Sequence, residues 1–193
     1  MKILSRKKKE KPPRNGQGTG MRPTEIRHKY VMAKAKMLSR ILNLRPPVDV
    51  NKLLQFQQVR LEFILDLCEP TVVKCGDDHI ILLPPYEKDE EIRWVATKKF
   101  AHVYLGHFEI YPVQRIIFGS VIETLSDAEL EILDREARVF ASELLMPEDL
   151  VKKLVSYPVS DDQIRTLEQY FGLAAEIVLD RITELNPVSP VHC

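Results

Sequence analysis

The sequences RWVATKKFAHVYLGH (residues 93–107) and DREARVFASELLMP (residues 134–147) decide the fold of this chain. In both stretches, apolar residues recur at the spacing of one helix face. The first stretch predicts a helix from Lys88 to about Gly106, and the second predicts a longer helix that ends at Pro147. We expect these two helices to face each other and to form the walls of a cleft.

The flanking sequence predicts further helices and a small sheet. Helices are expected over residues 24–45 with Thr24 as the N-cap, over 48–56, from about 148, over 160–172 and over 174–185; Ser126 with Glu129 and Ser160 with Gln163 form capping boxes. Alternating apolar residues predict strands over 59–65, 72–75 and 79–83, and Gly76-Asp77-Asp78 suits a hairpin turn. The sequence therefore predicts an α+β fold in which a small antiparallel sheet packs against a helical bundle.

Composition limits the chain to one domain of ordinary size. Its 193 residues are 45% hydrophobic, which is enough for one core. Residues 1–20 combine a Lys/Arg cluster, two adjacent prolines and spaced glycines with little to bury, so they predict a disordered basic arm. We expect the folded domain to span residues 21–185 and a flexible tail to span residues 186–193.

The charges balance over the whole chain but divide unevenly along it. Lys plus Arg total 28 and Asp plus Glu total 28, yet residues 1–45 hold 14 basic and 2 acidic side chains and residues 46–193 hold 14 and 26. An acidic body disfavours nucleic-acid binding. No apolar run is long enough to span a membrane and no secretory signal is evident, so we expect a cytoplasmic protein. Cys68, Cys75 and Cys193 suggest neither a disulfide framework nor a zinc cluster, and we interpret them as free thiols.

The two quoted stretches resemble the ImmA/IrrE-type metallopeptidases, a family with a zincin-like fold. In that family the first stretch carries His-Glu-x-x-His and closes with Leu-Gly-His, as this chain does at residues 105–107. The second family motif reads Glu-Ala-Asn-x-Phe-Ala and then Leu-Leu-Met-Pro. This chain matches it from Glu136 to Pro147, with Arg138 in place of the asparagine. The resemblance extends more loosely over residues 24–185.

The resemblance implies that two of four functional positions have changed. In an active member, two histidines four residues apart and a glutamate on the next long helix bind zinc, and the glutamate beside the first histidine is the general base. The corresponding residues here are Lys98, Lys99, His102 and Glu136. His102 and Glu136 remain as vestigial metal ligands, whereas Lys98 replaces the first ligand and Lys99 replaces the base.

Lysine at these positions opposes both zinc binding and hydrolysis. A divalent ion about 4 Å from an ammonium group meets a repulsion of roughly 8 kcal/mol at an effective dielectric constant near 20. Removing the lysine proton near pH 7 costs about 4 to 5 kcal/mol. Catalytic zinc sites normally have three protein ligands, and a protonated Lys99 cannot accept a proton from water. We therefore expect no catalytic residue and no cofactor.

Two interpretations of Lys98 remain open. Its ammonium group pairs with Glu136 across the cleft in place of the ion, or it extends to solvent while His102 is a core histidine. Helical projection places His107 about 140° from His102, which predicts packing or capping for His107. A minor alternative is an unconventional metal site of His102 and His107 with Glu109, Glu136 or Glu143. The simpler interpretation of Glu143 is a solvated or core-edge carboxylate. The isolated histidines are interpreted as non-ligands: His28, His79 and His192.

The resemblance implies the function and the class of partner. We expect a catalytically silent protein that uses the former peptidase cleft to bind a protein, because ImmA/IrrE proteins act with helix-turn-helix repressors of mobile elements or stress responses. One alternative is an active zinc-dependent endopeptidase that cleaves such a repressor. A second is a nucleic-acid-associated protein that acts through the basic arm, although Arg165 and Arg181 are the only basic residues of 161–185 and are too few for a recognition helix.

Overall fold

The computed structural model describes residues 22–86, 88–111, 115–117 and 125–186. The helices are α1 His28–Ile41, α2 Val50–Gln57, α3 Asp89–Tyr104, α4 His107–Ile110, α5 Asp127–Leu145, α6 Glu148–Leu154, α7 Asp161–Phe171 and α8 Ala175–Leu185, and the strands are β1 Arg60–Phe63, β2 Thr71–Cys75, β3 Asp78–Leu83 and β4 Arg115–Ile117. The predicted arm and, apart from Asn186, the predicted tail lie outside the described residues. Within those residues, no helix is both long and apolar enough to cross a bilayer.

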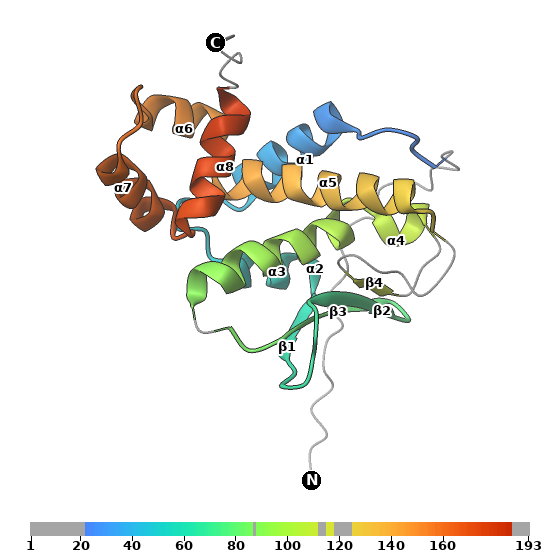
Figure 1. Cartoon of the computed structure of the whole chain (residues 1–193). Coiled ribbons are helices and arrows are strands. Elements are labelled where there is room, and N and C mark those ends of the chain that lie inside the picture. Colours follow the sequence, from blue (N-terminus) through green and yellow to red (C-terminus); the bar gives the residue numbers. More distant parts are fainter. Residues whose placement is uncertain (1–21, 87, 112–114, 118–124, 187–193) are drawn as a thin grey trace.

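The elements are arranged in layers, and helix α3 forms the middle layer. The sheet lies below α3, α5 lies above it with α1 alongside, and α6, α7 and α8 gather at one end (Figure 1). The mixed α+β class expected from the sequence is confirmed. This arrangement places the two quoted stretches, which form α3 and α5, side by side in the centre of the domain.

The sheet has four strands in the order β1-β3-β2-β4. Strand β2 is antiparallel to both β3 and β4, as expected, but β1 runs parallel to β3. The expectation of a wholly antiparallel sheet was wrong because β1 pairs with β3 instead of with β2, its neighbour in sequence. The short strand β4 was not predicted from the sequence.

The middle of α3 is buried on all sides. Seven consecutive residues, from Ala96 to His102, are buried. The single apolar stripe expected from the sequence was therefore too narrow a description, because α3 packs against α5 on one side and against the sheet on the other. As a consequence, Lys98 and Lys99 are enclosed by neighbouring elements although they are charged.

Local capping signals mark some of the helix ends. Ser126 and Glu129 form the predicted capping box at the start of α5. Gly172 ends α7 in the left-handed conformation, and a side chain there would collide with the Arg93 guanidinium, which donates to the Gly172 carbonyl. The N-cap expected at Thr24 was wrong, because α1 begins after Arg27.

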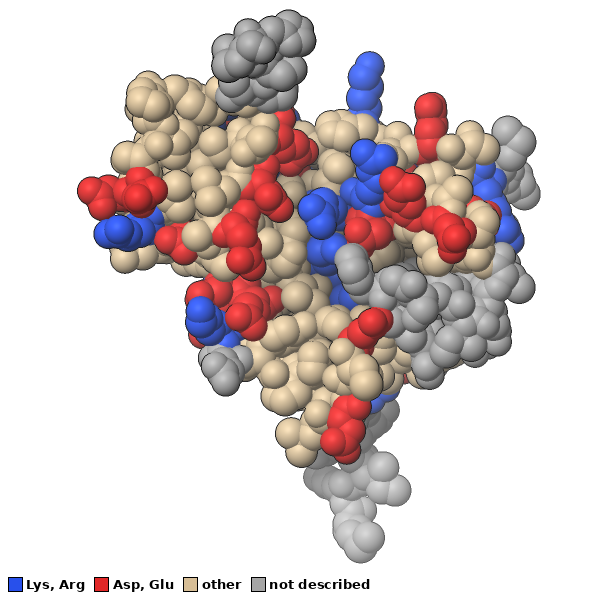
Figure 2. Space-filling model, in the orientation of Figure 1, with Lys and Arg blue, Asp and Glu red and all other residues tan. Residues whose placement is uncertain are grey.

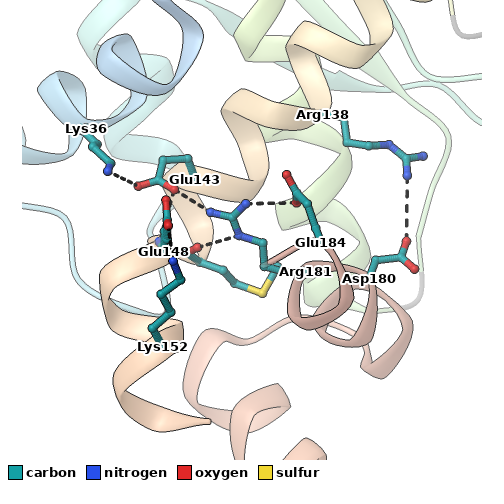
Figure 3. A network of polar contacts seen from close by, with 9 residues as sticks. Lys36, Arg138, Glu143, Glu148, Lys152, Asp180, Arg181 and Glu184 are labelled. Atoms are coloured by element: carbon teal, nitrogen blue, oxygen red, sulfur yellow. Dashed lines mark hydrogen bonds and ion pairs between the residues drawn. The ribbon is translucent and has the colours of Figure 1, made fainter. Parts of the chain in front are cut away.

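A buried ion pair joins α8 to α5. The Arg181 guanidinium lies 2.6 Å from the Glu143 carboxylate, each side chain is 1% exposed, and Arg181 also donates to the Met146 carbonyl (Figure 3). Glu143 further accepts a hydrogen bond from the Glu148 backbone amide. The expectation that Glu143 is a solvated or core-edge carboxylate was wrong, because its partner Arg181 comes from a helix 38 residues away. Arg181 is thereby unavailable to contact nucleic acid.

Candidate functional site between the motif helices

Helices α3 and α5 bring the four predicted motif residues into one buried region. Lys98 is 9% exposed, Lys99 4%, His102 3% and Glu136 0%. The three α3 residues lie within little more than one helical turn, and Glu136 lies on the adjoining helix α5. The predicted residues therefore share a neighbourhood, but as enclosed side chains and not as the walls of an open cleft.

Glu136 is held by Arg27, which precedes the first turn of α1. The Arg27 guanidinium donates to both carboxylate oxygens, over 2.8 Å from Nε and 2.6 Å from Nη2, and the Arg27 backbone N–H donates to Oε1 over 2.8 Å. A bidentate arginine contact is a strong form of charge-assisted hydrogen bond. The carboxylate also lies at the positive end of the α1 dipole. This tertiary contact explains why α1 begins at His28 and not near Thr24.

His107 completes the set of groups around Glu136. Its Nε2 lies 3.1 Å from Glu136 Oε2, and its Nδ1 lies 2.9 Å from Nδ1 of His102. The expectation that His107 points away from His102 was wrong. Helix α3 ends at Tyr104 and the chain turns at Gly106 with φ of +73°, so the helical projection does not extend to residue 107.

The hydrogen bonds among Glu136, His107 and His102 determine which ring nitrogens carry a proton. An ionised Glu136 only accepts, so His107 donates from Nε2 and, when neutral, accepts at Nδ1. His102 then donates from Nδ1, and its Nε2 carries the lone pair. Burial lowers the pKa of His102 and of His107, which keeps both rings neutral near pH 7.

The pKa of Glu136 reflects two opposed effects. Burial alone would raise it, but hydrogen bonds from Arg27 and His107 outweigh the burial and lower the pKa to about 2. Glu136 is therefore a carboxylate throughout the physiological range, and its charge is balanced by the Arg27 guanidinium. No metal ion is needed to neutralise it.

Lys98 pairs with Asp134, so the pair with Glu136 and the extension to solvent that the sequence offered for Lys98 were both wrong. His102, by contrast, is a buried core histidine, as the second interpretation expected. Its ammonium group lies 2.9 Å from the Asp134 carboxylate, and its side chain is 11% exposed. Asp134 and Glu136 are two residues apart on α5, which separates their side chains by about 200° around the helix axis. The Asp134 side faces Lys98, whereas the Glu136 side faces Arg27 and His107.

Lys99 has a different environment. Among the residues that the structure describes, its ammonium group has no hydrogen-bond or ion-pair partner, although Asp134 and Glu69 contribute favourable charge. Burial, with a smaller contribution from the positive charge of Lys98, lowers the pKa of Lys99 to about 8. Lys99 thus remains mostly protonated at pH 7 as a buried cation without an ion pair to any described residue.

These residues do not fit a zinc ion. Glu136, the predicted third ligand, already uses both oxygens in contacts with Arg27 and His107. Two lysines stand beside His102 where a donor and a base would be required, and ammonium groups repel a divalent cation. In the described parts of the chain, no three His, Cys, Asp or Glu side chains are grouped so that they could hold a metal.

The remaining candidates lie elsewhere. Glu109 pairs with Lys74 in an exposed contact, and His79 packs against Phe108. Cys68 and Cys75 are free and exposed, as expected. His28 is an exposed residue at the start of α1, and His192 and Cys193 lie outside the described residues.

Sequence reasoning missed Arg27 and Asp134 as members of the site. Arg27 lies 109 residues from Glu136 in the sequence, and no local pattern links the two. Asp134 opens the second quoted stretch, so the periodicity of α5 could have indicated that it lies opposite Glu136. The contacts of Arg27 with Glu136 and of Asp134 with Lys98 depend on how separate helices pack.

The fold and this neighbourhood define the class of protein. A central helix that carries metallopeptidase motif positions lies between a small mixed sheet and a second motif helix, which is the arrangement of a metallopeptidase-like α+β domain. The particular family follows from a match of residues 63–183, more than half of the chain, to Peptidase_M78, the IrrE N-terminal-like domain. The chain belongs to this family. A comparison with curated proteins finds no match.

Proposed function

We propose that this chain is a catalytically silent member of its family and that it binds a protein partner through the region around α3 and α5. The Arg27–Glu136 contact is the observation that carries the proposal. Arg27 lies before the matched residues 63–183, so a residue outside the family domain neutralises a carboxylate within it. The family scaffold is thereby held together without the charge of a metal.

Catalysis is opposed at three separate points. Lys98 at the first ligand position is paired with Asp134, and Lys99 at the base position is a cation. The third ligand position, Glu136, is hydrogen-bonded to Arg27 and His107. Because these obstacles involve different side chains, reversing one of them leaves the other two in place.

The proposed partner is a helix-turn-helix transcription regulator of a mobile element or a stress response. This class of partner follows from the resemblance to ImmA/IrrE proteins, and such a regulator would place the protein in the cytoplasm. Direct nucleic-acid binding by the last two helices is not favoured, because Arg181 is buried in its ion pair with Glu143. A silent homologue that keeps the scaffold can still bind or shield the regulator.

Zinc content tests the silent site. We expect no stoichiometric zinc in the wild-type protein and little in the variant Lys98→His/Lys99→Glu, because Arg27 still occupies Glu136. Adding Arg27→Met to that variant releases the carboxylate, so the triple variant is expected to bind about one zinc per chain at pH 7, as measured by elemental analysis after dialysis. A further His102→Ala substitution should abolish this binding.

The zinc series has two outcomes that contradict the proposal. Stoichiometric zinc retained by the wild-type protein would favour an active zinc-dependent endopeptidase. A double variant that binds zinc as well as the triple variant would show that Arg27 does not block the site.

Capture of the regulator tests the partner. The immobilised full-length chain should recover a helix-turn-helix regulator from its native host, identified by mass spectrometry. Arg138 is an exposed residue of α5. Arg138→Glu is expected to reduce the recovery at least about fivefold, because it replaces a cation on the proposed binding surface by an anion. Arg165→Glu, an exposed substitution on α7, is the matched control and should leave recovery unchanged. Equal recovery by both variants, or recovery of no such regulator, would contradict this interface or this partner.

A further inference from the structure

Lys99 is a buried charge without a counter-ion in the described part of the chain. The residue is only 4% exposed, yet its ammonium group has no ion pair or hydrogen bond to any residue that the structure describes. Buried lysines are rare unless they are paired, because removing an ammonium group from water is costly. An unpaired ammonium group in such a position is suited to an anionic group from outside the chain.

Two other cations near this position, Lys98 and Arg138, each lie close to a carboxylate. Lys98 is balanced by Asp134 at 2.9 Å. Arg138 follows Asp134 by one helical turn on the same face of α5, and its guanidinium lies 3.9 Å from the exposed Asp180 carboxylate. Lys99 has no such partner among the described residues, although Asp134 and Glu69 contribute favourable charge.

Charged side chains reach the surface between α5 and α3. Figure 2 shows Lys and Arg side chains that run from α5 toward α3, with Asp and Glu side chains beside them. Asp134 is one-third exposed and the Arg138 side chain is 54% exposed, so the outer part of this group reaches solvent. Four methylene groups allow the Lys99 side chain to adjust toward an entering anion.

We propose that Lys99, with Lys98 next to it in α3 and Arg138 on the adjoining helix α5, binds the carboxylate of an acidic side chain presented by the partner protein. The inference rests on the proposed function, because it names the chemical group that the partner contributes. Lys99 donates hydrogen bonds to the carboxylate, and Arg138 adds attraction at the outer edge of the site. The cation that opposes zinc chemistry thereby serves to recognise an acidic segment.

A peptide-retention experiment tests this inference on the full-length protein. Two degenerate libraries are compared, acetyl-XXX-Glu-XXX-amide and acetyl-XXX-Gln-XXX-amide, in which X is a mixture of uncharged amino acids. Peptides retained by the immobilised protein, above those retained by bare resin, are quantified by mass spectrometry. We expect the wild-type protein to retain the Glu library about fivefold more than the Gln library, a factor typical of one partly exposed charged contact.

Three variants assign this preference to Lys99. Lys99→Met is expected to lower the ratio of Glu to Gln peptides to about 1, whereas Lys99→Arg should keep most of the preference because it restores the charge. Lys52→Met removes an exposed lysine of α2 and one unit of charge, so it should leave the ratio unchanged. Circular dichroism of each variant verifies folding.

Each contrary outcome has a separate meaning. Retention of both libraries in equal amounts would overturn the carboxylate site and leave the proposed binding of a partner standing. Retention of neither library would contradict both. If inorganic phosphate shifts the NMR signal of the Lys99 side chain while the two libraries are retained equally, the ligand is a free anion and the inference is overturned.

Discussion

Replacing Arg27 by methionine is expected to lower the free energy of unfolding by about 3 to 5 kcal/mol at pH 7, the usual cost of leaving a buried charge, here the Glu136 carboxylate, without its partner. The Glu136 side chain is 1% exposed, and it loses three hydrogen bonds if the backbone contact is disturbed together with the guanidinium. Methionine preserves most of the apolar stem, so the loss reports the charge and its hydrogen bonds. Urea denaturation followed by circular dichroism measures the change.

The same substitution should alter the dependence of stability on pH. Because the folded pKa of Glu136 is about 2 and lies below the ordinary glutamate value of 4.5, its contribution is fully present above pH 4.5 and is lost as the pH falls toward 2. The difference corresponds to about 3 kcal/mol. We expect Arg27→Met to reduce this acid-dependent loss, since the remaining donor, His107, is weaker than the guanidinium.

A matched control separates burial from the loss of an arginine. Arg22 pairs with Glu129 at 3.0 Å, but its side chain is 43% exposed. Arg22→Met is therefore expected to cost less than about 1 kcal/mol, as exposed ion pairs usually do. If Arg27→Met costs no more than Arg22→Met, the Arg27–Glu136 contact does not stabilise the domain as described.

Replacing Lys99 by methionine is expected to stabilise the domain by about 2 to 3 kcal/mol at pH 7. Folding lowers the pKa of Lys99 from 10.5 to about 8, so the folded chain holds this proton less tightly than the unfolded chain. A difference of this size corresponds to roughly 3 kcal/mol, and methionine fills a similar volume without a charge. A destabilising charge retained in a buried position is expected where a residue serves binding at the expense of stability.

The pH dependence gives the second measurement for Lys99. Between pH 8 and 10.5 the unfolded chain keeps the Lys99 proton while the folded chain loses it, so the unfolded state binds more protons and the stability rises with pH. We expect a gain of about 2 kcal/mol between pH 8 and about 9.5 in the wild-type protein and its loss in Lys99→Met. Measurements stop at pH 9.5 because Tyr104 and Tyr111 have raised pKa values, which act in the opposite direction at higher pH.

Lys52→Met is again the control, because Lys52 is exposed on α2 and its removal should change the stability little. A Lys99→Met variant that is less stable than the wild-type protein, with an unchanged rise above pH 8, would show that Lys99 has a partner in solution. That result would also remove the basis for a carboxylate site at Lys99.

Local patterns in the sequence were sufficient to predict the two motif helices of the site, α3 and α5. The capping box at Ser126 and the apolar spacing of residues 93–107 predicted α5 and α3 because capping and amphipathic spacing act within a few residues. The hairpin turn at Gly76 was predicted for the same reason. The parallel pairing of β1 with β3 could not be predicted in this way, because it depends on which distant strand lies beside β1.

The sequence by itself determined which chemical groups this protein possesses at the motif positions: Lys98, Lys99 and His102 on one predicted helix and Glu136 on another. The tertiary structure decided what each group does. It placed Arg27 against Glu136 and Asp134 against Lys98, and a turn after α3 returned His107 to His102. Helical periodicity fixes the face on which a side chain lies, but the partner on that face depends on how separate elements pack. The charge balance of the site therefore follows from tertiary packing and not from local sequence.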